Sequence, residues 1–164
     1  MTPEVHRPVA LDRIGPQGHA VLVEARPAEL PAIAARLGVP AVHALRCAFR
    51  LRRAGGGVIE AEGDLSASLT QTCVVSLEDF QDLLHDCFTV HFVPAGTEDD
   101  NPDPDAPDQL PFEGGAVDLG EAAVEQLALA LDPYPRKPGA TLPTDAEDGP
   151  SGPFAVLARL RTPQ

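Results

Sequence analysis

The chain has 164 residues, of which 43% are hydrophobic, and it carries a formal net charge of −13. This length suits one domain with a single core. No apolar run approaches the roughly 18 residues of a membrane-spanning helix, and the first residues lack the apolar stretch of a secretory signal. Three cysteines are an odd number that suits reduced thiols, so we expect a cytoplasmic protein.

The charge is segregated along the chain. Residues 1–53 carry eight arginines and four acids, residues 54–132 carry 18 acids and neither Lys nor Arg, and residues 133–164 carry four bases and three acids. The central acids must therefore pair with the terminal arginines, face water, or meet a basic partner. Such a field repels nucleic-acid phosphates and attracts basic proteins. A solvated surface that promotes solubility is the alternative interpretation.

The first elements are short. Residues 5–9 predict an extended segment in which Pro8 favours an edge position. Residues 19–25 predict a second strand, and residues 27–37 predict a helix with one apolar face. Gly38 is typical of the residue that ends such a helix.

The clearest pattern is a β-hairpin. Residues 45–52 alternate apolar and polar, residues 54–57 read Ala-Gly-Gly-Gly, and residues 59–69 alternate again. We expect two antiparallel strands with opposite charges on their outer faces. The opposed residues would be Arg46, Arg50 and Arg52 on one strand and Glu60, Glu62 and Asp64 on the other.

The middle of the chain is less regular. We expect residues 73–77 to continue as an extended segment, and residues 87–93 to form a strand that Pro94 closes. Residues 78–86 fit either period, and Ser76 with Asp79 resembles a helix capping box, but we favour an extended segment. Residues 95–116 predict an acidic loop of the disordered type, since six acids and three prolines lie between Glu98 and Asp108.

A second helix is expected from its cap. Asp118 is placed to cap it, with Glu121 three residues later reaching back, and Pro133 ends it. Residues 139–152 have the composition of a Pro/Gly linker. The apolar tail at residues 153–164 is expected to dock on a single domain formed by residues 1–138.

Catalytic and metal-binding patterns are weak. His85, Cys87 and His91 would share one face of a strand and offer three ligands for zinc, but their spacing matches no strong pattern, and ordinary residues on a sheet face explain them. No serine has a placed base, and no Lys or Arg lies near Cys73 in sequence to lower its pKa. We expect no enzyme activity and no cofactor.

Four stretches in order resemble the YceD family of large ribosomal RNA subunit accumulation proteins, in its alphaproteobacterial form. They are residues 65–78, residues 88–94 with the acidic gap that follows, residues 117–136, and the tail around residues 152–158. The resemblance implies a role in accumulation or processing of 23S ribosomal RNA and brings no catalytic residues. Many members carry a Cys-x-x-Cys pair, of which this chain matches only the first position, Cys73, with Ser76 at the second.

These observations combine into one interpretation. We expect an α+β fold, with a twisted or partly closed antiparallel sheet packed by two main helices. Its role would be that of a ribosome-assembly factor that binds a basic ribosomal protein or the large-subunit precursor, with weak or indirect rRNA contact and no contact with DNA or membrane. A metal-binding or redox module built on Cys and His is the alternative. The expected partner-binding residues are Glu78, Asp79, Asp118, Glu121, Arg46, Arg50, Arg52, Arg53 and Arg136.

Overall fold

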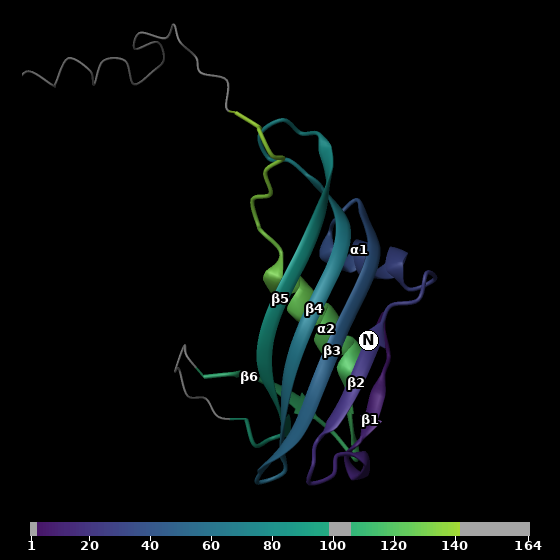
Figure 1. Cartoon of the computed structure of the whole chain (residues 1–164), viewed down its shortest axis with the longest axis vertical. Helices are drawn as coiled ribbons and strands as arrows, with labels where there is room; N and C mark the ends of the chain where they lie inside the picture. Colours follow the sequence, from purple (N-terminus) through teal and green to yellow (C-terminus); the bar gives the residue numbers. More distant parts are fainter. Residues whose placement is uncertain (1–2, 99–105, 142–164) are drawn as a thin grey trace, which may run out of the picture.

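The computed structural model describes residues 3–98 and 106–141, which form an α+β fold around one five-stranded sheet. The sheet has the order β2-β3-β4-β5-β6, antiparallel except for the parallel β5–β6 pair, and β1 and β7 form a separate antiparallel pair. Its strands are long and twisted, and the sheet stays open (Figure 1). The elements in chain order are β1 (Pro8–Ala10), a 3₁₀ turn (Leu11–Arg13), β2 (His19–Glu24), α1 (Leu30–Leu37), β3 (Ala41–Gly55), β4 (Val58–Thr72), β5 (Asp79–Pro94), β6 (Asp108–Phe112), β7 (Ala116–Asp118) and α2 (Leu119–Ala130).

The predicted β3–β4 hairpin is confirmed, and its turn uses the glycine run. Gly55, Gly56 and Gly57 all have positive φ, a conformation that side chains with a Cβ rarely adopt. The resulting register places Arg52 opposite Glu60 and Arg50 opposite Glu62, as expected from the alternation. The third expected pair is wrong, because the same register sets Arg46 opposite Ser66, and Asp64 opposite Ala48.

The next hairpin corrects one boundary. Residues 73–77 do not continue the strand: β4 ends at Thr72, and the chain turns back through Leu77, which has a φ of 59°. Hydrogen bonds from the Cys73 amide to the Glu78 carbonyl (2.9 Å) and from the Leu77 amide to the Cys73 carbonyl (2.9 Å) close this turn. The extended interpretation of residues 78–86 is confirmed from Asp79 onward, where β5 begins, while Glu78 still belongs to the turn.

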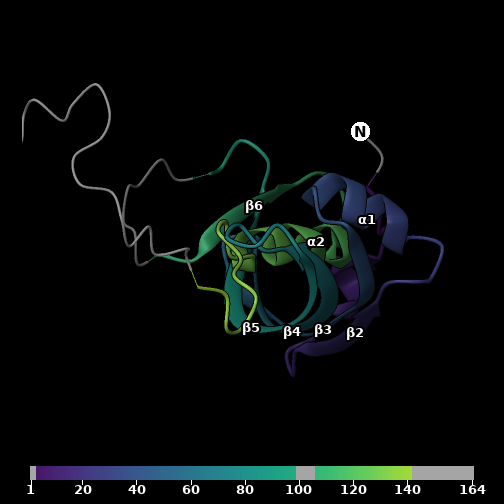
Figure 2. The ribbon, with the colours of Figure 1, turned by 90° about the horizontal axis from the view of Figure 1, so that it is seen from above.

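The inner face of the sheet holds the core. Strands β2 to β5 curve around α2, which lies across their concave side (Figure 2). Leu119, Ala123 and Leu127 of the helix are fully buried against apolar residues such as Phe49 and Leu65. Among the described residues, none of the helices has the length and apolar character needed to cross a bilayer.

A row of three residues across the sheet explains why position 63 of the core is a glycine. Phe49, Gly63 and Phe88 lie opposite one another on β3, β4 and β5. The two rings meet edge to face at 5.8 Å, and a Cβ on Gly63 would lie 2.6 Å from Cε2 of Phe88. The glycine therefore leaves the space that the Phe88 ring occupies.

The regions between and after these elements revise the expected boundaries. The predicted loop at residues 95–116 contains β6, which pairs with residues 90–94 of β5, and the start of β7. The helix expected at residues 27–37 begins at Leu30, and the helix expected after Asp118 spans Leu119–Ala130. The linker beyond residue 141 and the apolar tail lie outside the described residues.

Candidate functional site

The arginines of β3 differ in how far the fold already engages them. Arg52 donates from Nε to Glu60 at 2.7 Å, and Arg53 donates from Nε to the Ile14 carbonyl at 2.9 Å. Arg46 has only a loose contact, 3.8 Å from Nε to a Glu24 oxygen. Arg50 is exposed and has no ion pair or hydrogen bond within the described part of the chain. Two of the four arginines are therefore available to a partner.

Asp118 and Glu121 of the α2 N-terminus bind other segments of the chain, the N-terminal segment and α1. Asp118 caps the helix by accepting hydrogen bonds from Gly120 and Glu121 N–H, and it also accepts one from the Arg7 amide at 2.9 Å. The Glu121 carboxylate, expected to reach back to the cap, accepts two hydrogen bonds from Arg36 at 2.7 and 3.0 Å. Both acids are thus committed to packing the chain against itself, which leaves them little freedom for a partner.

The tip of the β4–β5 hairpin is an exposed apolar and charged surface. Leu77 and Tyr134 are 78% and 71% exposed. Glu78 pairs with Lys137 at 2.9 Å, and Asp79 accepts a hydrogen bond from Thr72 at 2.8 Å. Arg136, next to Lys137 in sequence, forms no ion pair or hydrogen bond in the part of the chain that the structure covers.

The turn at this tip places Cys73 in an unusual environment. Its side chain is buried, and the Ser76 amide donates to its Sγ at 3.4 Å. The Ser76 hydroxyl and nearby backbone N–H groups lower the pKa of Cys73 to about 6, so the expectation that nothing near it lowers this pKa is wrong. The pKa is lowered by hydrogen bonds and not by a cation. A search of the sequence for nearby basic residues therefore could not predict this shift.

The same turn carries the two positions, 73 and 76, at which many members of the resembled family have a Cys-x-x-Cys pair. A structural zinc site needs four strong ligands, usually thiolates and imidazoles. Here the turn offers one thiolate and the hydroxyl of Ser76, and Cys73 belongs to no group of three His, Cys or carboxylate ligands in residues 3–98 and 106–141. The turn therefore keeps the hydrogen bonds that favour a thiolate but does not fit a metal.

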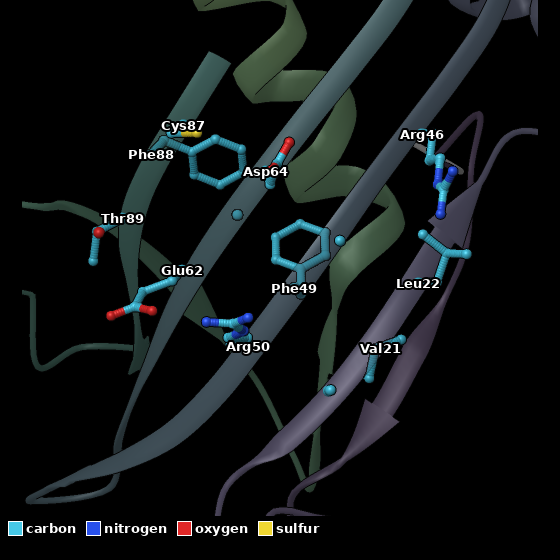
Figure 3. A pocket seen from close by; sticks show the side chains of 13 residues that line it. Val21, Leu22, Arg46, Phe49, Arg50, Glu62, Asp64, Cys87, Phe88 and Thr89 are labelled. Atoms are coloured by element: carbon cyan, nitrogen blue, oxygen red, sulfur yellow. The ribbon is translucent and has the colours of Figure 1, made fainter. Parts of the chain in front are cut away.

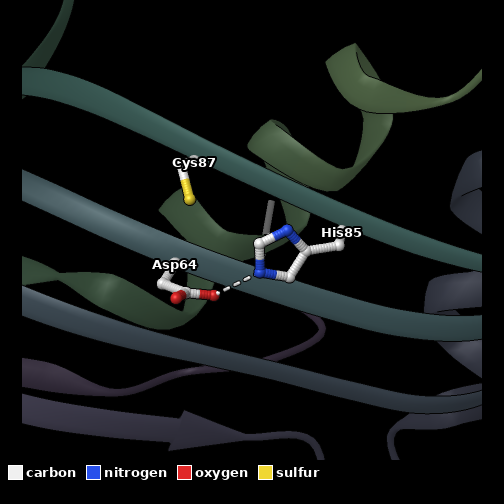
Figure 4. Close-up of side chains that lie close together, drawn as sticks. All are labelled: Asp64, His85 and Cys87. Carbon is white, nitrogen blue, oxygen red and sulfur yellow. Dashed lines mark hydrogen bonds and ion pairs between the residues drawn. The ribbon is translucent and has the colours of Figure 1, made fainter.

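A different group of ligands lies on the outer face of the sheet. The ligand atoms of Asp64, His85 and Cys87 all lie within 4.8 Å of one another, and all three residues are exposed (Figure 4). Asp64 and Cys87 are directly opposite across β4 and β5, and His85 Nε2 lies 3.0 Å from an Asp64 oxygen. The expected trio is corrected in one member: His91 is on the same face, but about 13 Å along the strand from Cys87, with its Nε2 3.6 Å from Glu60.

An open groove of about 780 Å³ runs over the same outer face (Figure 3). Its lining includes Arg46, Arg50, Glu62 and Asp64 from the two central strands, and it extends to Leu22 on β2 and to Cys87 on β5. The mixture of both charge signs gives the groove no strong preference for an anion or a cation.

The charge segregation of the sequence becomes a separation across the sheet. The arginines at positions 46, 50, 52 and 53 lie on β3, whereas β5 carries Asp79, Asp82 and Asp86 with neither Lys nor Arg. Asp82 accepts a hydrogen bond from the neutral Gln71 amide group at 2.6 Å, and no Lys or Arg of the described residues pairs with it. Sequence reasoning did not single out Asp82 and Asp86 for a partner, because their position beside the open side of the sheet depends on the β4–β5 register.

Comparison with known proteins agrees with the resemblance found in the sequence. Residues 61–161 match the family described as the large ribosomal RNA subunit accumulation protein YceD. No curated protein and no solved structure gives a significant match. The matched region begins in β4 and includes β5, β6 and α2.

Proposed function

Since the chain belongs to the family of the large ribosomal RNA subunit accumulation protein YceD, we propose that it is a non-catalytic assembly factor that acts in the cytoplasm. It supports accumulation and processing of 23S rRNA by binding a basic ribosomal protein, either free or on the precursor of the large subunit. The family name carries the link to large-subunit rRNA. The contact with a protein, and the absence of catalysis, are our own inferences from the chain.

The observation that supports a protein partner is the uncompensated acidity of β5. Three carboxylates lie on this strand, and within residues 3–98 and 106–141 the one Lys or Arg ion pair near its start is that of Lys137 with Glu78. Carboxylates at this density repel a phosphate backbone and lower the free energy of a nearby cationic chain. Ribosomal proteins, which must bind RNA, present such cationic surfaces before they are assembled.

Direct RNA contact would have to use the few cations that the fold leaves available. Among the described residues they include Arg46 and Arg50 on β3, Arg136 near the hairpin tip and Arg13 in the 3₁₀ turn, which lie on separate segments of the chain. A protein that neutralises few phosphates binds RNA weakly at physiological salt. We therefore assign rRNA contact a secondary part.

The test has a cellular and a biochemical part. Depletion of the protein should reduce 23S rRNA and accumulate large-subunit precursors, with small-subunit rRNA as the internal control. Affinity purification of the full chain at low and moderate salt should recover a basic ribosomal protein, also after RNase treatment. A variant with Arg50→Ala and Arg136→Ala should recover it equally well. Recovery of naked rRNA without ribosomal protein, lost in that variant, would contradict the protein-partner mechanism.

The cluster of Asp64, His85 and Cys87 supports a second candidate function, binding of a divalent metal. Carboxylate, imidazole and thiolate are all zinc ligands, and three protein ligands leave a fourth position open to water or a substrate. The ligands project from two adjacent strands with an unbroken ladder, so small side-chain movements suffice to bring them to a common ion.

Metal analysis of the purified protein distinguishes this candidate. Zinc bound in a one-to-one ratio should be lost on Cys87→Ser and His85→Ala and weakened on Asp64→Asn. His91→Ala is the matched control, because it removes an imidazole from the same face of β5 outside the cluster. Zinc that survives Cys87→Ser, or is lost equally in the control, would exclude this site.

A further inference from the structure

One long segment of β5 has a strand on only one side. β5 pairs with β4 from Asp79 to Phe92, whereas β6 pairs only with residues 90–94. We name residues 80–89 the open edge. No described residue forms a backbone hydrogen bond to it on the side away from β4, and Figure 1 shows β6 joining β5 only at the lower end.

The open edge has the length and regularity that strand addition needs. Ten residues span about 33 Å, and every second residue directs its N–H and C=O away from β4. The pairing with β4 shows no register shift, and no proline or lysine lies in the segment. Register shifts, prolines and lysines are devices that proteins commonly use to prevent pairing at an edge, and the open edge has none of these three.

The inner side chains of the open edge form an alternating row. Phe80, Leu84 and Phe88 are half-buried, and Asp82 and Asp86 stand between them. Leu84 and Phe88 pack at the margin of the core, where the sheet has no further strand to cover them. An added strand would bury this apolar surface and bring its own side chains against the two carboxylates.

The carboxylates also determine which strand can be added. A second copy of the open edge would bring the same row of acids against Asp82 and Asp86, and like charges opposite each other are destabilising. Inward-pointing charges are a known protection against pairing of identical edges. A cationic strand would instead be attracted, because it would place a positive side chain opposite Asp82 and another opposite Asp86.

We propose that the open edge is the docking site for an extended basic segment of the partner, which adds as a strand beside β5. This rests on the proposed function, in which the partner is a basic ribosomal protein. Because inner-face positions recur every two residues, the segment should carry Lys or Arg at two positions four apart, opposite Asp82 and Asp86, with an apolar residue midway, opposite Leu84. The pattern reads basic-x-apolar-x-basic in either strand direction.

The test uses the full chain and two synthetic peptides of identical composition. One contains Lys-Thr-Val-Thr-Lys flanked by threonines, and the other has the two lysines adjacent and the valine at one end. We expect the patterned peptide to bind at least ten times more tightly by fluorescence anisotropy. It should also slow amide hydrogen exchange within residues 80–89. Equal binding of the two peptides, or protection confined to other residues, would overturn the proposal.

Charge variants separate this docking mode from general acidity. Asp82→Asn with Asp86→Asn should remove most of the preference for the patterned peptide. Glu98→Gln with Glu113→Gln, the same change in net charge at exposed positions off the edge, should keep it. Equal losses in the two double variants would overturn the proposal, as would concentration-dependent dimers that protect residues 80–89 without peptide.

The outcome is distinguishable from the fate of the proposed function. If a ribosomal protein copurifies with the wild-type chain and with the Asp82→Asn, Asp86→Asn variant alike, the docking site is wrong and the proposed function stands. If depletion leaves 23S rRNA unchanged and no ribosomal protein copurifies, the proposed function fails. Binding of the patterned peptide at the open edge would then still establish the edge as a site for basic strands.

Discussion

At Gly120 the backbone of the N-terminal segment leaves no room for a Cβ, and this close approach provides a sharp test of the fold. The N-terminal segment crosses the first turn of α2 there, with the Leu119 amide donating to the Arg7 carbonyl at 3.1 Å. A Cβ at Gly120 would lie 2.7 Å from the Val5 carbonyl carbon and closer still to its oxygen. Val5 is fully buried, so its backbone has no free space to move into.

Gly120→Ala therefore sets two effects against each other. Alanine is the better helix former by about 1 kcal/mol. Overpacking against backbone costs about 1–3 kcal/mol or more, and displacement of the N-terminal segment would also weaken its hydrogen bonds to Leu119 and Asp118, at about 1 kcal/mol each. We expect a net loss of about 2 kcal/mol in the free energy of unfolding, or a fall of about 4–8 °C in Tm for a chain of this size.

Urea denaturation followed by circular dichroism measures this loss, and two other glycines calibrate it. Gly115 has ordinary φ and no atom near its missing Cβ, so Gly115→Ala should be neutral or stabilising by up to about 1 kcal/mol. Gly63→Ala should fall between them, because the atoms it meets belong to the Phe88 ring, which can turn aside. A Gly120→Ala protein as stable as wild type would refute the crossing of the N-terminal segment over α2.

Two further predictions concern ionisable groups. Arg36→Met removes hydrogen bonds to Glu4 and Glu121 and should cost about 1 kcal/mol at pH 7. Because the pKa of Glu4 is lowered in the folded state, its contribution to stability is lost as the pH falls through this lowered pKa. Urea denaturation at pH 3 should therefore show a smaller difference in free energy of unfolding between wild type and Arg36→Met. An equal difference at both pH values would contradict the pairing. The pKa of Cys73 is lowered to about 6 in the folded state, so between about pH 6 and 8.5 the unfolded chain binds more protons than the folded chain. The difference in free energy of unfolding between wild type and Cys73→Ala should therefore grow with pH across this window. Parallel profiles of the two proteins would contradict the lowered pKa.

Local patterns predicted the elements whose register is set by a short turn. The β3–β4 hairpin follows from two alternating runs and a glycine turn, and the expected pairing of Arg52 with Glu60 depends on nothing more distant. Asp118 was identified as a helix cap for the same reason, since its contacts with Gly120 and Glu121 lie within three residues.

Local patterns could not predict contacts between segments that are distant in the sequence. Strand β6 contains Pro111 and follows an acidic stretch, so no periodicity marked it, and its parallel pairing with β5 requires the chain to return from a distance. Glu121 was expected to face its own helix cap, but the arginine that binds it is 85 residues away. In the metal-ligand group, the face of His85 and Cys87 was predicted by alternation, whereas Asp64 joins them only through the β4–β5 register.

The absence of cations between residues 54 and 132 has opposite consequences on the two sides of β4. On the β3 side, Arg52 pairs with Glu60 and contacts Glu62, which also engages a cation that RNA binding would need. On the β5 side no arginine of residues 3–98 and 106–141 pairs with Asp82 or Asp86, which lie on the strand segment that lacks a second neighbour. The same deficit that weakens RNA contact thus makes self-pairing of the open edge unfavourable and favours a cationic strand, so charge and backbone geometry both support the proposal of a basic protein segment as the partner.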